Sequence, residues 1–178
     1  AVLSPSVARN LRAAREAIQV LTDGQKYVIR ALKGTHRALI PGSAGSGKTV
    51  VACEKAIRLD AAGFRTLLLC HNPWLAERLE AMTDGSDVEV RNFRAWLSSL
   101  RSPGLRLEET PTWQRHDEPS IEELERGLRS LESSPPQWDA IIVDEGQDFR
   151  EDWWHLVDAA VRPGGTLYVF VDDDQRVL

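Results

Sequence analysis

The amino-acid sequence predicts an α/β fold, in which a parallel sheet of about five strands carries helices on both faces. The continuous apolar run at residues 65–70 is typical of a strand that is buried on both faces, and the apolar segments at 37–41, 139–144 and 166–172 also indicate strands. Segments with apolar residues at helical spacing separate these runs. Strands that alternate with helices form a parallel sheet, because each helix must cross over the sheet between one strand and the next.

Cap residues, periodicity and helix breakers set the order of the elements. Ser6 and Thr22 are N-cap residues that start helices, and Gln25 completes a capping box with Thr22. Residues 102–137 hold five prolines and many charges, and are predicted to be irregular around one amphipathic helix. In chain order, the predicted elements are helices at 6–20 and 22–33, a strand at 37–41, a helix at 48–62, a strand at 65–70, a helix at 73–82, a strand at 87–91, helices at 93–100 and 120–131, a strand at 139–144, a helix at 153–161, a turn at 163–165 and a strand at 166–172.

Length and composition fit one domain spanning residues 1–178, with a short insertion at about 98–137. The net charge of -5 argues against a protein that coats duplex DNA nonspecifically. Cys53 and Cys70 are predicted to be buried, reduced thiols. No apolar run reaches the ~18 residues that span a membrane, and no signal peptide opens the chain. We therefore expect a cytoplasmic protein without a membrane partner.

Residues 42–49 match the phosphate-binding (Walker A) pattern G-x-x-x-x-G-K-S/T without exception. The glycines allow backbone angles that other residues resist, so successive amide groups can surround an anion at a helix N-terminus. Lys48 is expected to reach the β- and γ-phosphates, and the Thr49 hydroxyl to bind Mg²⁺. A Gly/Ser-rich surface loop is the alternative, but an apolar strand precedes this loop and a helix follows it. The sequence therefore predicts a P-loop NTPase fold that binds ATP and Mg²⁺ through Gly42, Ser43, Ala44, Gly45, Ser46, Gly47, Lys48 and Thr49.

Two carboxylates follow the apolar run at 139–144, at the end of a strand where open parallel sheets bind their ligands. Asp144 is placed to hold Mg²⁺, and Glu145 to accept a proton from an attacking water. Acids at strand ends are also common for structural reasons, and only the phosphate-binding loop makes the catalytic interpretation specific. A second acid beside the metal ligand favours hydrolysis over transfer to a substrate hydroxyl, and so disfavours a small-molecule kinase.

The segment Asp144-Glu145-Gly146-Gln147-Asp148-Phe149 resembles the Walker B motif D-E-x-Q-D-F/L of UvrD/Rep-like superfamily 1 DNA helicases. Four more segments resemble motifs of this family in the same order: residues 21–25 its Q motif, 68–75 its motif Ia, 88–93 the next DNA-facing segment, and 170–175 its motif III. The resemblance covers the chain from about residue 21 to its end. It implies the first, RecA-like motor domain of such a helicase, present here as a fragment.

The resemblance implies roles for further residues. In the family, the Q-motif glutamine reads adenine and the motif III glutamine senses the γ-phosphate, which would be Gln25 and Gln175 here; Gln25 could also act only as a capping-box partner. Catalytic roles then fall to Glu145, Lys48 and Gln175. Single-stranded DNA, or RNA as the alternative, is expected to contact His71, Asn72, Trp74, Asn92 and Phe93.

The chain departs from the family pattern at several positions. Residues 92–94 read Asn-Phe-Arg where the family commonly has Thr-Phe-His, and Val171 replaces a glycine of motif III. A second motor domain, which supplies arginines that complete the ATP site, is missing from this sequence. Such arginines contribute about 10³–10⁵ in rate in related phosphoryl-transfer enzymes, so we expect slow hydrolysis from the fragment. The main alternative function is a nucleotide-gated regulatory ATPase without strand-separating activity.

Overall fold

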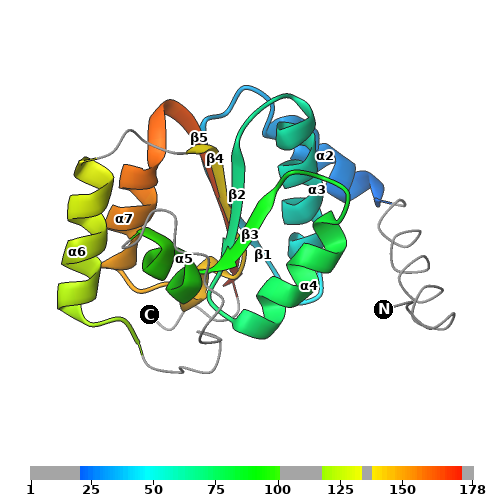
Figure 1. The fold of residues 1–178 in the computed structure, drawn as a ribbon. Coiled ribbons are helices and arrows are strands. Elements are labelled where there is room, and N and C mark those ends of the chain that lie inside the picture. Colours follow the sequence, from blue (N-terminus) through cyan, green and yellow to red (C-terminus); the bar gives the residue numbers. More distant parts are fainter. Residues whose placement is uncertain (1–20, 101–117, 134–137, 174–178) are drawn as a thin grey trace, which may run out of the picture.

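The computed structural model describes residues 21–100, 118–133 and 138–173. Five parallel strands form one sheet in the order β1-β5-β4-β2-β3 (Figure 1). The predicted α/β fold with a five-stranded parallel sheet is therefore confirmed. The strands are β1 (Arg37–Gly42), β2 (Thr66–Cys70), β3 (Glu89–Asn92), β4 (Trp138–Val143) and β5 (Val161–Asp172).

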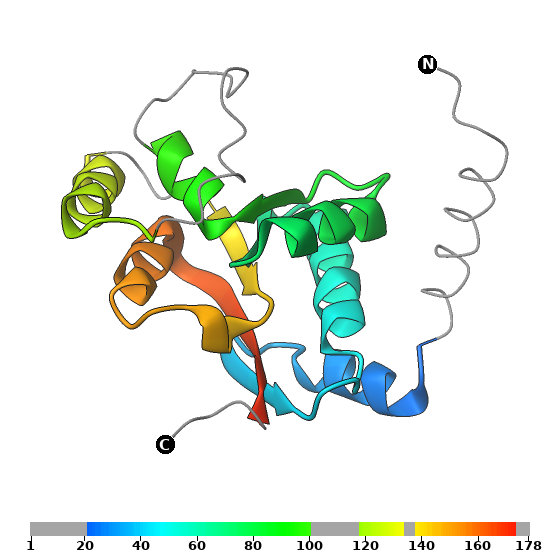
Figure 2. The same ribbon diagram turned by 90° about the horizontal axis from the view of Figure 1, so that it is seen from below.

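Helices cover both faces of the sheet, as predicted (Figures 1 and 2). One face carries α2 (Asp23–Ala31), α3 (Lys48–Ala61) and α4 (Pro73–Thr83). The other face carries α5 (Phe93–Leu100), α6 (Ile121–Glu132) and α7 (Trp153–Ala160). The helix predicted at 6–20 lies outside the described residues, as does most of the predicted irregular segment at 102–137.

The central strands contribute side chains to two hydrophobic cores, one on each face of the sheet, because successive side chains alternate between the faces. In β2, Leu67 and Leu69 pack with α5, α6 and α7, whereas Leu68 and Cys70 pack with α2, α3 and α4. All five residues of β2 are buried, which explains why the sequence shows a continuous apolar run instead of an alternating one. Two-sided packing fixes the positions of the central strands β2 and β4, whereas the edge strand β1 has no buried residue and is held by its pairing with β5.

Two capping boxes fix the starts of helices. The Thr22 hydroxyl accepts from the Gln25 amide and the Gln25 side chain accepts from the Thr22 amide, as the sequence predicts for α2. Ser120 and Glu123 make the same reciprocal pair at the start of α6. Glu123 also accepts two hydrogen bonds from Arg94, at 3.0 and 3.3 Å, which joins α5 to α6.

The turn predicted at 163–165 is instead an irregularity within one long strand. Pairing between β4 and β5 continues on both sides of it, since Val161 pairs with Trp138 and Thr166 pairs with Ala140. Four residues of β5 therefore face a single residue of β4, which is a bulge. Gly164 takes a positive φ of 75° there, as a bulge permits for glycine. The Pro-Gly-Gly segment thus has the irregular backbone that its composition predicts, but the flanking pairs keep it in the sheet.

No helix among the described residues is long and apolar enough to cross a membrane. Trp96, Trp138 and Trp153 are at most 3% exposed, so these three side chains pack in the core. Cys53 and Cys70 are buried free thiols, as expected.

Candidate functional site

The phosphate-binding loop connects the carboxyl end of β1 to the first residue of α3. Gly45 and Gly47 adopt φ angles of 75° and 82°, in the left-handed region that favours glycine. Gly47 is the N-cap of α3, and no side chain caps this helix end, so the amides of the first turn remain open to an anion. Residues 43–46 are exposed, which leaves the concave side of the loop accessible.

Lys48 folds back onto its own loop. Its ammonium donates to the carbonyl oxygens of Gly42 and Ser43, at 2.6 and 2.9 Å. It also lies 3.7 Å from a carboxylate oxygen of Asp172, at the end of β5. The lysine is thus positioned at the tip of β1 where a phosphate bound by the loop would lie.

Asp144 follows β4 on the same edge of the sheet and is fully buried. Neither carboxylate oxygen has a hydrogen-bond partner in the described part of the chain. Burial raises the pKa of Asp144 to about 6, with a smaller upward contribution from the Glu145 carboxylate; the nearby Thr49 hydroxyl, the Glu145 backbone amide and the Lys48 ammonium oppose this shift. The Thr49 hydroxyl is thus close enough to favour the charged form without making a hydrogen bond of normal geometry.

The two residues predicted to hold Mg²⁺ fit that ion. A buried carboxylate without partners has a strong requirement for a cation, and a neighbouring hydroxyl adds a second oxygen ligand. Within the described ranges, no group of three or more His, Cys, Asp or Glu side chains could hold a metal by itself. An ion held by Asp144 and Thr49 would therefore take its other ligands from phosphate oxygens and water, as Mg²⁺ commonly does.

Glu145 has an unusual backbone conformation. Its φ and ψ angles of 54° and 49° make it the one residue other than glycine with a positive φ among those described. Its carboxylate accepts a 2.6 Å hydrogen bond from the Gln147 side-chain amide, and Gln147 in turn accepts a 2.9 Å hydrogen bond from the Asp172 backbone amide. Left-handed residues that are not glycine cluster at functional sites, where surrounding contacts hold them in place.

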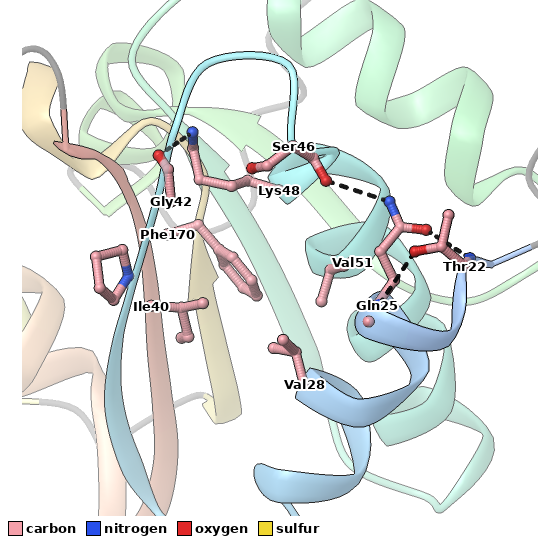
Figure 3. A pocket seen from close by; sticks show the side chains of 11 residues that line it. Thr22, Gln25, Val28, Ile40, Gly42, Ser46, Lys48, Val51 and Phe170 are labelled. Atoms are coloured by element: carbon pink, nitrogen blue, oxygen red, sulfur yellow. Dashed lines mark hydrogen bonds between the residues drawn. The ribbon is translucent and has the colours of Figure 1, made fainter.

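Gln25 joins the start of α2 to the phosphate-binding loop. Besides its capping role, its amide nitrogen donates to the Ser46 carbonyl over 3.4 Å, and a Cβ on Gly47 would lie only 2.2 Å from that nitrogen. Next to Gln25 lies a cavity of about 290 Å³ between α2, β1 and the loop (Figure 3). Its lining combines apolar side chains, such as those of Val28, Ile40 and Phe170, with polar groups at the phosphate side.

The residues predicted to contact nucleic acid have different surroundings. His71, Asn72 and Trp74 are exposed where β2 leads into α4, and Trp74 is 65% exposed. Asn92 is buried, and its side chain accepts from the Ala95 amide at the start of α5. Phe93 is fully buried and stacks on Trp153 with ring centres 4.2 Å apart. The prediction of a nucleic-acid contact by Phe93 is therefore wrong for this conformation, because its ring is enclosed in the core.

Asp172 belongs to this edge of the sheet and lies within the segment 170–175 that resembles motif III, although the resemblance assigns a role there only to Gln175. It contacts Lys48 and, through its backbone, Gln147. Its position at the carboxyl end of a buried strand could have identified it, since the other site carboxylate ends a strand in the same way. Gln175 itself lies outside the described residues.

The chain has similarities to known proteins in sequence and in fold. A family model described as an AAA domain matches residues 25–178. No curated protein matches the chain. A solved structure described as the structural basis for DNA unwinding at forked double-stranded DNA by two coordinating Pif1 helicases matches with a TM-score of 0.47 and 19% identity. That match covers 86% of this chain but 33% of the other, so the chain spans about a third of the length of that protein.

Proposed function

This chain belongs to the AAA-domain family whose model it matches and is a superfamily 1 helicase motor domain, and on that premise we propose that it binds and hydrolyses ATP with Mg²⁺. The observation that carries the proposal is the meeting of a buried, unpartnered carboxylate, Asp144, with a glycine-rich loop whose amides are open. The loop binds the phosphates, and Lys48 pairs with the β- and γ-phosphates. The adenine lies beside Gln25 at the neighbouring cavity.

In this proposal Asp144 and Thr49 would hold Mg²⁺, and the ion would neutralise negative charge on the phosphate oxygens. Glu145 accepts a proton from the attacking water at a carboxylate oxygen. The hydrogen bond from Gln147 supports this role because it fixes the orientation of the Glu145 carboxylate. Gln175 is proposed to sense the γ-phosphate, and arginines from a second motor domain to complete the site.

The nucleic-acid partner we propose is a single strand that crosses the carboxyl edge of the sheet near β2 and β3. Trp74 offers an exposed aromatic face on which a base can stack, and His71 and Asn72 lie beside it. A protein with a net charge of -5 has to bind a nucleic acid at a local surface rather than through its overall charge. Asn92 contributes by fixing the start of α5 rather than by direct contact.

Nucleotide binding is tested by titrating a fluorescent ATP analogue into the wild-type protein and into Lys48→Ala. We expect Lys48→Ala to abolish binding, because the ammonium that pairs with the phosphates is lost, and circular dichroism checks that the variant is folded under the conditions of the titration. Lys33→Ala, which removes an exposed lysine after α2, is the matched control and should bind like the wild type. Equal affinities of all three proteins would refute the assignment of the site.

The helicase proposal and the regulatory ATPase alternative differ in their response to DNA. Single-stranded DNA should bind the wild-type protein and should bind Trp74→Ala about 5- to 100-fold more weakly, as expected for the loss of one stacked base. Tyr27→Ala removes another exposed aromatic ring, on α2, and should leave the affinity for DNA unchanged. A protein that binds nucleotide normally but shows no affinity for single-stranded DNA at low salt would favour the regulatory alternative.

A further inference from the structure

Lys48 and Asp172 form a buried ion pair at the centre of the phosphate-binding site. Their side chains are 8% and 7% exposed, and the ammonium lies 3.7 Å from the carboxylate. Two loop carbonyls complete the surroundings of the ammonium, at 2.6 and 2.9 Å. Buried charges are costly when they lack a partner, so this lysine has a complete set of internal partners in the absence of nucleotide.

A polyphosphate that reaches Lys48 must therefore compete with Asp172. The phosphate oxygens and the Asp172 carboxylate are both anions that seek the same ammonium, and they also repel each other at short range. The affinity for nucleotide is the difference between the free energies of these two pairings. A residue that stabilises Lys48 in the nucleotide-free protein consequently weakens nucleotide binding.

Asp172 is also connected to the proposed general base. Its backbone amide donates to the Gln147 side-chain oxygen, and the Gln147 amide donates to Glu145. A change in the position of Asp172 is therefore passed to the group that orients the Glu145 carboxylate. Contacts from Lys48 to Asp172, from Asp172 to Gln147 and from Gln147 to Glu145 thus link the partner of the lysine to the orientation of the Glu145 carboxylate.

We propose that Asp172 is an internal competitor of the nucleotide: it holds Lys48 in the empty site and must yield the ammonium to a di- or triphosphate. The inference rests on the proposed function, since it assumes that Lys48 pairs with the β- and γ-phosphates. It makes Asp172 a determinant of nucleotide affinity, although it makes no bond to the nucleotide. A purely structural role for Asp172 predicts the opposite sign, because loss of the ion pair would then loosen the site.

The substitution Asp172→Asn separates these roles. Asparagine has nearly the same shape and keeps the backbone amide that donates to Gln147, so the change removes little more than the negative charge. Asp173→Asn is the matched control, since Asp173 is exposed and its substitution removes the same charge one residue away. Any general reduction of repulsion between protein and polyphosphate appears equally in both variants.

The experiment is an equilibrium titration of the wild type and both variants with fluorescent analogues of ATP, ADP and AMP, in the presence of Mg²⁺. Asp172→Asn should bind ATP and ADP about 3- to 10-fold more tightly and AMP without change, because AMP has no β-phosphate to meet Lys48. Asp173→Asn should stay within about twofold of the wild type. Unchanged or weaker binding of ATP by Asp172→Asn, or an equal gain in Asp173→Asn, would overturn the inference.

Two further results keep the outcome unambiguous. If the wild type binds none of the nucleotides, the proposed function fails, whereas normal binding without the predicted gain defeats only the role of Asp172. If Asp172→Asn does not fold, the double variant Lys48→Met/Asp172→Asn should fold again, because it removes both buried charges together. Failure of the double variant to recover the fold would contradict a direct pairing of the two side chains.

Discussion

The side-chain amide of Gln147 donates a 2.6 Å hydrogen bond to the carboxylate of Glu145, the residue with a left-handed backbone next to the buried Asp144. Gln147 lies two residues farther along the chain, in the short 3₁₀ helix Gly146–Asp148 that follows Glu145. The left-handed turn at Glu145 is what points its side chain back toward Gln147 and toward the end of β5. Backbone strain and side-chain orientation at this residue are therefore two aspects of one arrangement.

The first prediction concerns this strain. A left-handed conformation costs a residue with a Cβ about 1–2 kcal/mol, and glycine is spared that cost. We expect Glu145→Gly to be more stable than Glu145→Ala by about 1 kcal/mol, although both lose the hydrogen bond to Gln147. Urea denaturation measures the free energies of unfolding. Neither variant should hydrolyse ATP in a single-turnover assay, if Glu145 is the general base.

Glu125, on the exposed side of α6, is the control position for that comparison. In the interior of a helix the order is reversed, since glycine is about 1 kcal/mol less favourable than alanine there. Glu125→Ala should therefore be more stable than Glu125→Gly. If alanine were more stable than glycine at position 145 as well, Glu145 would not be strained.

The second prediction concerns the close packing of Gly146 against β5. A Cβ at this position would lie 2.5 Å from a methyl group of Val169 and 3.3 Å from the Phe170 carbonyl oxygen. Gly146→Ala should lower the free energy of unfolding by about 1–3 kcal/mol, as overpacking does elsewhere. Because Glu145 and Gln147 flank this glycine, single-turnover hydrolysis should fall as well.

Removal of the opposing methyl group tests the cause. In the double variant Gly146→Ala/Val169→Ala the new Cβ has room. The stability lost on adding Gly146→Ala to Val169→Ala should therefore be smaller than the stability lost on adding it to the wild type. Gly24→Ala, at an exposed site in α2 with no neighbour closer than 4.0 Å, is the control and should be neutral or stabilising. Additive losses in the double variant would exclude the contact with Val169 as the reason.

The fold is predictable from the sequence because apolar runs mark the strands, and the run in β2 also indicates how deeply that strand is buried. Leu67, Leu68 and Leu69 are all fully buried, and a run of this kind has no other stable location than a sheet covered on both faces. Cap residues such as Thr22 act over three or four positions, so their hydrogen bonds are also predictable. The phosphate-binding loop belongs to the same class, since its function depends on the backbone conformation of consecutive residues.

The relationships that the sequence does not predict join residues far apart in the chain. The Lys48–Asp172 ion pair depends on β5 lying next to β1, an order of strands that no local pattern specifies. The prediction for Phe93 fails because a motif gives positions along the chain but not the direction of side chains. Its helical spacing with Trp96, Leu97 and Leu100, all buried, is the signal for a core residue.

The third prediction separates core from surface at the proposed nucleic-acid face. Phe93 stacks on Trp153 and meets Phe149 edge-on at 5.5 Å, so Phe93→Ala should lower the free energy of unfolding by about 3–5 kcal/mol. Trp74→Ala, by contrast, should change stability by less than about 0.5 kcal/mol and weaken binding to single-stranded DNA. Denaturant unfolding and a DNA titration of both variants measure the two effects. A Phe93→Ala protein of normal stability but reduced DNA affinity would restore Phe93 to the nucleic-acid surface.

The fourth prediction follows from the pKa of Asp144, which burial raises to about 6 from an ordinary value of 3.8. The folded protein then binds a proton more tightly than the unfolded chain, so the free energy of unfolding falls as the pH rises from about 4 to about 6. The shift of about two pKa units corresponds to a loss of about 3 kcal/mol above pH 6. In the absence of nucleotide and Mg²⁺, this group makes the domain less stable at neutral pH than at pH 4.

Asp144→Asn isolates that contribution because asparagine cannot lose a proton. The difference in unfolding free energy between the variant and the wild type should shift in favour of the variant by about 3 kcal/mol between pH 4 and pH 7.5. Other titrating groups remain in both proteins and cancel in the difference. Addition of Mg²⁺ and nucleotide should stabilise the wild type at pH 7.5 and have little effect on the variant, since the bound cation gives the Asp144 carboxylate the partner that it lacks. A pH-independent difference between the two proteins would mean that Asp144 is already paired in the free protein, and would remove the main reason for placing Mg²⁺ beside it.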